Sequence, residues 1–211
     1  MHYKFEAEQR QQEVREFQAR HRARLAESWD LEAGGRILEI GCGQGDMTSV
    51  LAEAVVFAHS SWYAASSSQL AHLLETVRPW AKRLCFAEWD LEPHSFDQFA
   101  HYLAISIQGQ IEAFKTQSTS NVRTPLSKTH VQASISGAGW EIERETEIDA
   151  HYLQDADWEI QAALSLSIEE LEGLKLPPKY IDLLKTHQEI LLRVSKPAGN
   201  KSLSVYSLVA S

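Results

Sequence analysis

Apolar positions along the chain form short continuous runs separated by stretches in which they return every three or four residues. The runs predict buried β-strands, and the three-and-four spacing predicts helices. The predicted strands are 36–40, 55–63, 82–89, 140–148 and 202–210. The predicted helices are 4–29, 46–54, 64–77, 94–117, 125–137 and one that begins at Pro177 and Pro178. Strands that alternate with helices predict an α/β fold with a mainly parallel sheet.

The first predicted helix is charged, rich in glutamine and poor in apolar residues. Its apolar positions are Phe5, Val14, Phe17, Leu25 and Trp29, and the last four fit one helical stripe. We interpret residues 1–33 as a helical cap on the domain. A substrate lid and a contact in a homodimer are the alternatives.

Composition narrows the class of protein. The 211 residues, 44% of them hydrophobic, suffice for one domain with a normal core. A formal charge of −9 argues against a nucleic-acid partner held mainly through phosphates. Cys42 and Cys85 both lie in apolar runs, so buried thiols are expected and no disulfide. No apolar run approaches membrane-spanning length and no signal-peptide core begins the chain, so a cytoplasmic protein that does not bind membranes is expected.

A glycine-rich turn follows the first predicted strand, with glycines at positions 41, 43 and 45 and Asp46 as the expected helix N-cap. Such a turn exposes backbone N–H groups to a ligand at the positive end of a helix. A dinucleotide site needs G-x-G-x-x-G, but here the third glycine comes one place early. A phosphate-binding P-loop needs Gly-Lys-Ser/Thr, but the chain reads Gly-Asp-Met. Both phosphate interpretations therefore fit poorly.

The segment Leu38-Glu-Ile-Gly-Cys-Gly-Gln-Gly45 resembles motif I of the class I S-adenosylmethionine-dependent methyltransferases. The resemblance implies S-adenosylmethionine as the cofactor, with the loop backbone under its methionine and ribose parts. Glu39, two places before the first glycine, would hold the cationic amino end. The cofactor-binding residues that it implies are Glu39, Gly41, Cys42, Gly43, Gly45 and Ser60.

The resemblance extends over the rest of the chain. The strands at 55–63, 82–89, 140–148 and 202–210 are similar to the family's fourth, fifth, sixth and seventh strands. The seventh would return antiparallel between the fifth and the sixth. The segments 94–136 and 151–195 are similar to the helical insertions that roof the substrate pocket in small-molecule methyltransferases. The expected fold is thus a Rossmann-like three-layer sandwich in a single domain, 1–211.

One part of the family pattern is missing. In the family a second strand ends in an acid about 20 residues beyond the glycines and binds the ribose hydroxyls. The corresponding positions, Ser60–Ser68, hold no carboxylate, and Glu53 still lies on the predicted helix 46–54. That helix runs directly into the strand at Val55 without a loop. We infer that strand 2, its helix and strand 3 are lost, which predicts the sheet order 1-4-5-7-6 with the first strand at an exposed edge.

Candidate catalytic residues are His59 and His101. His59 follows the strand at 55–63 and is the best candidate base, because an imidazole titrates near neutral pH; a hydrogen bond to a nearby carbonyl is the alternative. His94, Asp97 and His101 are spaced to share one helix face, which Gln108 extends, so the face lines the pocket or is solvated. We expect no metal site there, because no further ligands are spaced to complete one.

The sequence therefore predicts an S-adenosylmethionine-dependent methyltransferase that acts on a small organic molecule. The first alternative is a non-catalytic methyltransferase-like remnant that binds the cofactor weakly or not at all. The second is an NAD-dependent oxidoreductase, which Asp46 and the missing ribose acid both disfavour.

Overall fold

The computed structural model describes residues 2–31, 35–40, 52–116, 118, 120–166, 173 and 176–211. Its strands are β1 (Ile37–Ile40), β2 (Ala52–Ala58), β3 (Ala81–Trp89), β4 (Ile142–Ile148) and β5 (Val205–Ala210). Its α-helices are α1 (His2–Ser28), α2 (Ser67–Val77), α3 (Phe99–Glu112), α4 (Lys128–Gly137), α5 (Asp155–Ser165) and α7 (Pro178–Val194). Short 3-10 helices are η1 (Ser61–Tyr63), η2 (Arg78–Trp80) and η3 (Phe96–Gln98). No described helix has both the length and the apolar character needed to cross a bilayer.

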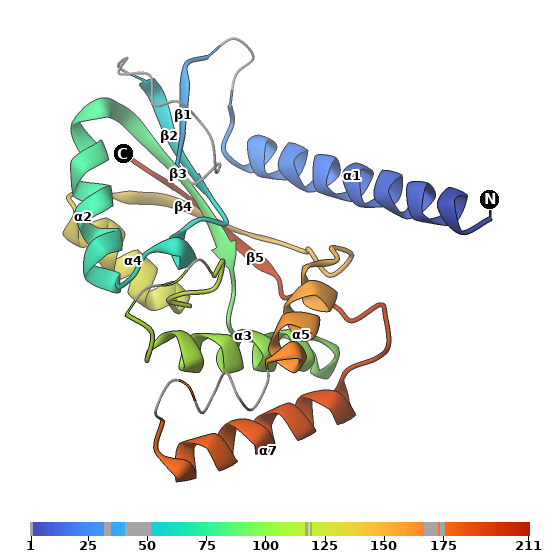
Figure 1. Cartoon of the computed structure of the whole chain (residues 1–211). Coiled ribbons are helices and arrows are strands. Elements are labelled where there is room, and N and C mark those ends of the chain that lie inside the picture. Colours follow the sequence, from blue (N-terminus) through green and yellow to red (C-terminus); the bar gives the residue numbers. More distant parts are fainter. Residues whose placement is uncertain are drawn as a thin grey trace.

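The strands form one sheet in the order β1-β2-β3-β5-β4 (Figure 1). β1, β2 and β3 run parallel, and β5 is antiparallel to both of its neighbours, β3 and β4. In family numbering this is the order 1-4-5-7-6, so the predicted topology is confirmed. The continuous apolar runs of β2 and β3 suit strands that are covered on both faces.

β1 is an edge strand in the described part of the chain, because its only partner there is β2. Only 11 residues, 41–51, lie between the end of β1 and the start of β2. A strand, its helix and a further strand need about 30 residues. The chain therefore has no room for the second and third strands of the complete family sheet, as the sequence predicts.

Helices cover the sheet on both faces and at one end (Figure 1). α2 and α4 pack on one face, over a core that includes Phe57, Leu84 and Phe86. The C-terminal part of α1 packs on the other face, around Val56 and Cys85. α3, α5 and α7 pack together beyond the carboxyl ends of β2 and β3 and have an apolar core of their own. This third group occupies the place where the sequence predicts helical insertions.

The apolar stripe of α1 faces the sheet near its C-terminal end. Leu25 and Trp29 are buried, with exposed fractions of 2% and 3%. Phe17 lies about two turns before Leu25 and packs on the ring of Tyr152, with 5.9 Å between ring centroids. Farther toward the N-terminus the helix extends away from the sheet (Figure 1). α1 therefore covers the sheet face with its second half, as a capping helix does.

The predicted junction between a helix at 46–54 and a strand at 55 is wrong. β2 already begins at Ala52, so Glu53 lies on a strand and its backbone N–H donates to the carbonyl of Arg36 over 2.9 Å. Ala and Glu favour helices by only a few tenths of a kcal/mol, which pairing with two neighbouring strands easily outweighs. Residues 46–51 of the predicted helix lie outside the described residues.

Two helix boundaries differ from the prediction. α3 begins at Phe99 and ends at Glu112, so it is shorter at both ends than the predicted 94–117, and Phe96 is 75% exposed. α4 is capped by Ser127, whose hydroxyl accepts from the N–H of His130, and the helix ends at Gly137 as predicted. Thr124, which directly precedes the predicted helix 125–137 and has a side chain suited to an N-cap, instead donates its backbone N–H to the carbonyl of Trp62. A tertiary hydrogen bond thus competes with the local capping signal.

Candidate active site

The candidate site lies where β2 and β3 end, next to the end of β1. Ile40, the last residue of β1, pairs with Phe57 in the parallel register. His59 directly follows β2, and Glu88 and Trp89 end β3. Open α/β sheets bind ligands outside the carboxyl ends of such strands. Polar side chains gathered at this edge are therefore candidates for function.

The backbone of His59 adopts an unusual conformation, with φ of +50°. Its N–H donates to the carbonyl of Ala87 on β3 over 2.9 Å, which holds the residue at the strand end. A non-glycine residue in the left-handed region costs about 1–3 kcal/mol unless its surroundings impose it. Such strain is common at functional sites, and here it sets the direction in which the imidazole leaves the strand.

Glu88 is a buried carboxylate beside this imidazole, with an exposed fraction of 1%. It accepts hydrogen bonds from the backbone N–H and the hydroxyl of Ser61, at 3.2 and 2.8 Å, and from the N–H of Trp89 at 3.1 Å. Nδ1 of His59 lies 3.4 Å from Oε1 of Glu88. That distance suits attraction between charges, although Nδ1 has no hydrogen-bond partner among the described residues. Three N–H and O–H donors thus point at the two oxygens of this side chain.

His21 reaches the site from α1, and the sequence analysis did not single it out. Its Nε2 lies 2.9 Å from Nε2 of His59, and its ring is parallel to that of Trp89, with an interplanar angle of 2°. Burial, and then the charges of His59, Arg24 and Arg22, lowers the pKa of His21 to about 3. The sequence does contain a signal for it. His21 lies on the apolar stripe of its helix, four residues after Phe17 and four before Leu25.

His101 lies in α3 and is fully buried. Its Nδ1 accepts from the N–H of Leu203 over 2.9 Å, and its ring meets Trp89 edge-on, with centroids 5.3 Å apart. Burial, and then the charge of His59, lowers the pKa of His101 to about 3. The structure thus brings His59 and His101 into contact with the ring of one tryptophan, Trp89.

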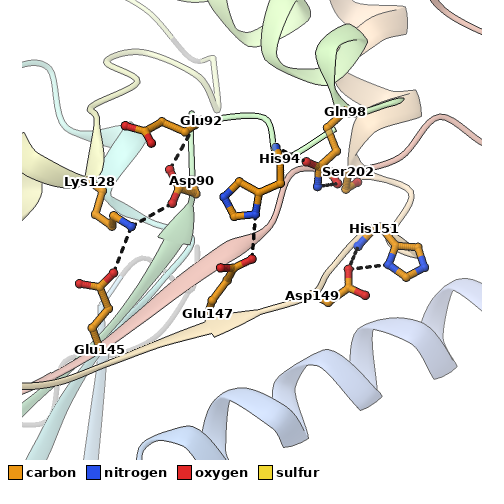
Figure 2. A network of polar contacts seen from close by, with 10 residues as sticks. All are labelled: Asp90, Glu92, His94, Gln98, Lys128, Glu145, Glu147, Asp149, His151 and Ser202. Atoms are coloured by element: carbon orange, nitrogen blue, oxygen red, sulfur yellow. Dashed lines mark hydrogen bonds and ion pairs between the residues drawn. The ribbon is translucent and has the colours of Figure 1, made fainter. Parts of the chain in front are cut away.

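His94 and Asp97 do not lie on one α-helix with His101 and Gln108 as predicted, because α3 begins only at Phe99. His94 pairs with Glu147 on β4 at 2.9 Å, as Figure 2 shows, and Asp97 pairs with Lys201. Figure 2 also shows Lys128 of α4 between Asp90 and Glu145, and these contacts tie the loop after β3 to α4 and β4. These polar contacts are structural. The described residues contain no group of three or more His, Cys, Asp or Glu side chains that could hold a metal ion.

Two more carboxyl groups lie near the histidines, both from α5. Burial raises the pKa of Asp155, and the charge of His59 opposes that shift. Burial also raises the pKa of Glu159, a shift that its hydrogen bond from Gln108 opposes and the charge of Asp155 adds to. Glu88 and Asp155 are thus two acidic side chains that interact with His59.

The predicted cofactor residues fall partly outside the described residues. Four of them lie outside the described residues, namely Gly41, Cys42, Gly43 and Gly45. Glu39 lies in β1 opposite Val56 of β2, and Ser60 directly follows His59. The Ser60 hydroxyl is buried and has no hydrogen-bond partner in the described part of the chain. Ser60 therefore offers an unsatisfied polar group at the strand end.

The aromatic pair after Ser60 separates into two environments. Trp62 is buried, with 5% exposed, and packs in the core that α1 covers. Tyr63 is 39% exposed. The carbonyl of Trp62 also accepts the N–H groups of Arg123 and Thr124, at 3.0 and 3.1 Å, which joins η1 to the segment before α4.

That segment borders a cavity of about 960 Å³ between α2, α3 and α7. Its lining includes Ser66, Glu112, Lys115, Arg123 and Tyr180. Ligand pockets for drug-sized molecules have about 300–1,000 Å³. The cavity is thus large enough for a small organic molecule, and its lining carries charges of both signs.

No protein-family model matches the sequence, and no curated protein matches it. A cyclopropane-fatty-acyl-phospholipid synthase-like protein from Lactobacillus casei ATCC 334 superposes with a TM-score of 0.78 at 24% identity, over 94% of this chain and 92% of that one. The chain has the methyltransferase-like, Rossmann-like fold. The likeness in structure and the strand order together carry this conclusion.

Two further solved structures match with lower scores. The [4+2]-cyclase SpnF does so with a TM-score of 0.46 at 13% identity, over 90% of this chain and 79% of that one. The mycolic acid cyclopropane synthase CmaA1, complexed with SAH and CTAB, does so with a TM-score of 0.46 at 12% identity, over 89% of this chain and 82% of that one.

Proposed function

We propose that this protein is an S-adenosylmethionine-dependent methyltransferase for a small organic molecule. The observation that supports it best is the position of His59 and Glu88 at the carboxyl ends of neighbouring strands in a methyltransferase-like sheet. In this proposal the chain acts as one domain, 1–211, with residues 1–33 as its cap and the helices within 94–136 and 151–195 over the acceptor. His59 handles the proton, and His101 contributes to the wall of the site.

The cofactor would be held by Glu39, Gly41, Cys42, Gly43, Gly45 and Ser60. When bound, S-adenosylmethionine supplies a methyl group on a positively charged sulfur. The described residues fit such a ligand in two respects. The unsatisfied hydroxyl of Ser60 can accept or donate a hydrogen bond, and Glu88, Asp155 and Glu159 make the region acidic. An acidic site favours a sulfonium and disfavours a pyrophosphate.

The cavity beside α2 and α3 is proposed to hold the part of the acceptor that is not methylated. Arg123 lines it and is hydrogen-bonded through its backbone to Trp62, three residues after His59. Glu112 also lines it and is 9% exposed, and its Oε2 has no hydrogen-bond partner among the described residues. The pocket can therefore pair with both an anionic and a hydrogen-bond-donating group of a small molecule.

The alternative of a non-catalytic remnant is favoured by one observation. The 11 residues between β1 and β2 cannot supply the strand whose acid binds ribose in the family. Loss of two hydrogen bonds to a charged acceptor, at about 1.5–3 kcal/mol each, weakens binding a hundredfold or more. Cofactor affinity therefore decides between the two functions.

Calorimetric titration with S-adenosylhomocysteine tests the proposal. We expect binding in the micromolar range, and we expect Glu39→Gln to weaken it about tenfold or more, because a hydrogen bond to a charged group contributes about 1.5–3 kcal/mol. Glu53→Gln is the matched control, since Glu53 is an exposed acid on the neighbouring strand β2. No heat from the wild-type chain at millimolar ligand would reject the enzyme in favour of the remnant.

A further inference from the structure

Both ring nitrogens of His59 face other side chains. Nδ1 lies 3.4 Å from Oε1 of Glu88, and Nε2 lies 2.9 Å from Nε2 of His21. A proton released by a bound molecule can therefore reach Nε2 of His59 only through His21, or after His21 has been displaced. His21 is 5% exposed and its ring lies parallel to that of Trp89, so it is firmly placed.

The partners assign the tautomer of each ring. Glu88 accepts from Ser61 and from the N–H of Trp89, and its Oε1 lies 3.4 Å from Nδ1 of His59. A carboxylate at that distance attracts a hydrogen on Nδ1 and repels a lone pair there. With the hydrogen on Nδ1, Nε2 of neutral His59 is an acceptor. Nε2 of His21 must then be the donor, which leaves the lone pair of His21 on Nδ1.

That lone pair has no hydrogen-bond partner among the described residues, and the atom is buried. An unpaired polar atom in the interior is destabilising, because it has lost its hydrogen bonds to water. A ligand group that donates a hydrogen bond to Nδ1 would remove this cost. The series of side chains therefore ends at the unpaired Nδ1 of His21 in α1 on one side and at Glu88 in β3 on the other.

We propose that Glu88, His59 and His21 form a proton relay whose entry atom is Nδ1 of His21. The relay takes up the proton that the methyl acceptor gives up, so it rests on the proposed function. The acceptor's X–H bond breaks and an N–H bond forms at Nδ1 of His21. The Nε2–H bond of His21 breaks, and its proton passes to Nε2 of His59. The acceptor gains the methyl, the donor's sulfonium becomes a neutral thioether, and the positive charge ends on His59.

The surroundings of the two rings explain why the positive charge ends on His59 and not on His21. His21 has Arg22 and Arg24 beside it on α1, and both cations oppose a charge on its ring. Burial adds to this effect, and the pKa of His21 is lowered to about 3. A proton held on His21 alone is therefore costly.

His59 has acidic neighbours instead. Glu88 of β3 lies 3.4 Å from its Nδ1, and Asp155 at the start of α5 also interacts with its charge. The histidine of α3 that faces it, His101, is neutral because its Nδ1 accepts a backbone hydrogen bond within the core. An imidazolium at His59 is thus paired, whereas one at His21 is not.

Side-chain ¹⁵N NMR of the whole chain, labelled at histidine, tests the relay without any acceptor, because the proton itself is the probe. At pH 7 we expect His21 as the Nε2–H tautomer and His59 as the Nδ1–H tautomer. On acidification the pair should take up one proton, with both nitrogens of His59 protonated and His21 changed to the Nδ1–H tautomer. The variant His21→Gln assigns the signals, and His72→Gln, on the exposed face of α2, is the matched control.

Three results would overturn the relay. One is a His21 that carries its hydrogen on Nδ1 at pH 7, and another is a first proton that leaves His21 charged and His59 neutral. The third is a wild-type chain that shows the expected tautomers but gives no heat with S-adenosylhomocysteine. That last result removes the proposed function and with it the use of the relay, whereas the first two reject the relay even if the cofactor binds.

Discussion

At the scale of single residues, one aromatic ring organises the polar groups of the candidate site. The rings of His21, His59 and His101 lie with their centroids 6.5, 4.7 and 5.3 Å from that of Trp89. They come from α1, from the end of β2 and from α3, so side chains far apart in the sequence share one surface. Two of the three histidines are buried enough to stay neutral at physiological pH. Buried neutral histidines link stability to pH.

His101 allows a direct test of this linkage. Burial lowers its pKa from 6.5 to about 3 in the folded chain. Between those values the unfolded chain binds the extra proton, so stability falls as the pH drops below 6.5 and the loss ends near pH 3. For a fully buried group, this loss of folding free energy is about 2 kcal/mol between pH 7 and pH 5.

We therefore expect His101→Gln to lose about 2 kcal/mol less stability than the wild type when the pH is lowered from 7 to 5. Urea denaturation at both pH values measures the difference. His72→Gln serves as the control, because the side chain of His72 is 79% exposed. Equal pH dependence in the wild type and the His101 variant would contradict a neutral buried imidazole.

At the scale of elements, α3 packs unusually closely against the segment before α4. A Cβ on Gly109 of α3 would lie 2.6 Å from Cγ and 2.9 Å from Cδ of Pro125. The glycine thus permits the approach that also places Arg123 and Thr124 on the carbonyl of Trp62. The cavity wall between α2 and α3 depends on this contact.

Gly109→Ala should therefore destabilise the protein. Alanine in a helix normally gains about 1 kcal/mol over glycine, but the clash with the proline ring should cost about 1–3 kcal/mol instead. Adding Pro125→Ala should recover most of the loss, and thermal unfolding of both single variants and the double variant measures the coupling. Gly137→Ala is the control, because nothing lies within 4 Å of a Cβ there. If Gly109→Ala lowered the stability equally in the presence and in the absence of the Pro125 ring, the clash would not be the cause.

At the scale of the whole molecule, the shortened sheet places β1 at an edge. β3 has a strand on each side and helices on both faces, whereas β1 is paired on one side in the described part of the chain and Ile37 is 46% exposed. Local opening needs little free energy where few contacts hold a strand. The sheet should therefore be least stable at the end where the complete family fold has two more strands.

Hydrogen exchange measures this gradient along the sheet. We expect the amides of β3 and β5 to exchange slowest, through global unfolding, and those of β1 to exchange faster through local opening. Mass spectrometry after partial exchange can compare peptides that cover each strand. Protection of β1 equal to that of β3 would contradict the edge position.

Part of the candidate site could be predicted from the sequence. His59 and Ser60 follow an apolar run, and strand ends in a parallel sheet are where ligands bind, so their position was predictable. The end of the helix predicted at 46–54 was wrong, because Ala52, Glu53 and Ala54 have helical preferences that strand pairing overrides. The prediction that His94 and His101 share one helix face was also wrong, because a short 3-10 helix precedes α3.

The sequence by itself indicated the sheet order and the missing segment, because its glycine-rich motif and the strands after it resemble those of the methyltransferases, and too few residues follow the glycines to form two more strands. Only the tertiary structure decided which polar groups meet. His21 is one polar position on an apolar stripe in the sequence, and it contacts His59 because the second half of α1 packs across the sheet. Hydrogen bonds between residues 38 positions apart depend on packing in three dimensions, which local patterns do not encode.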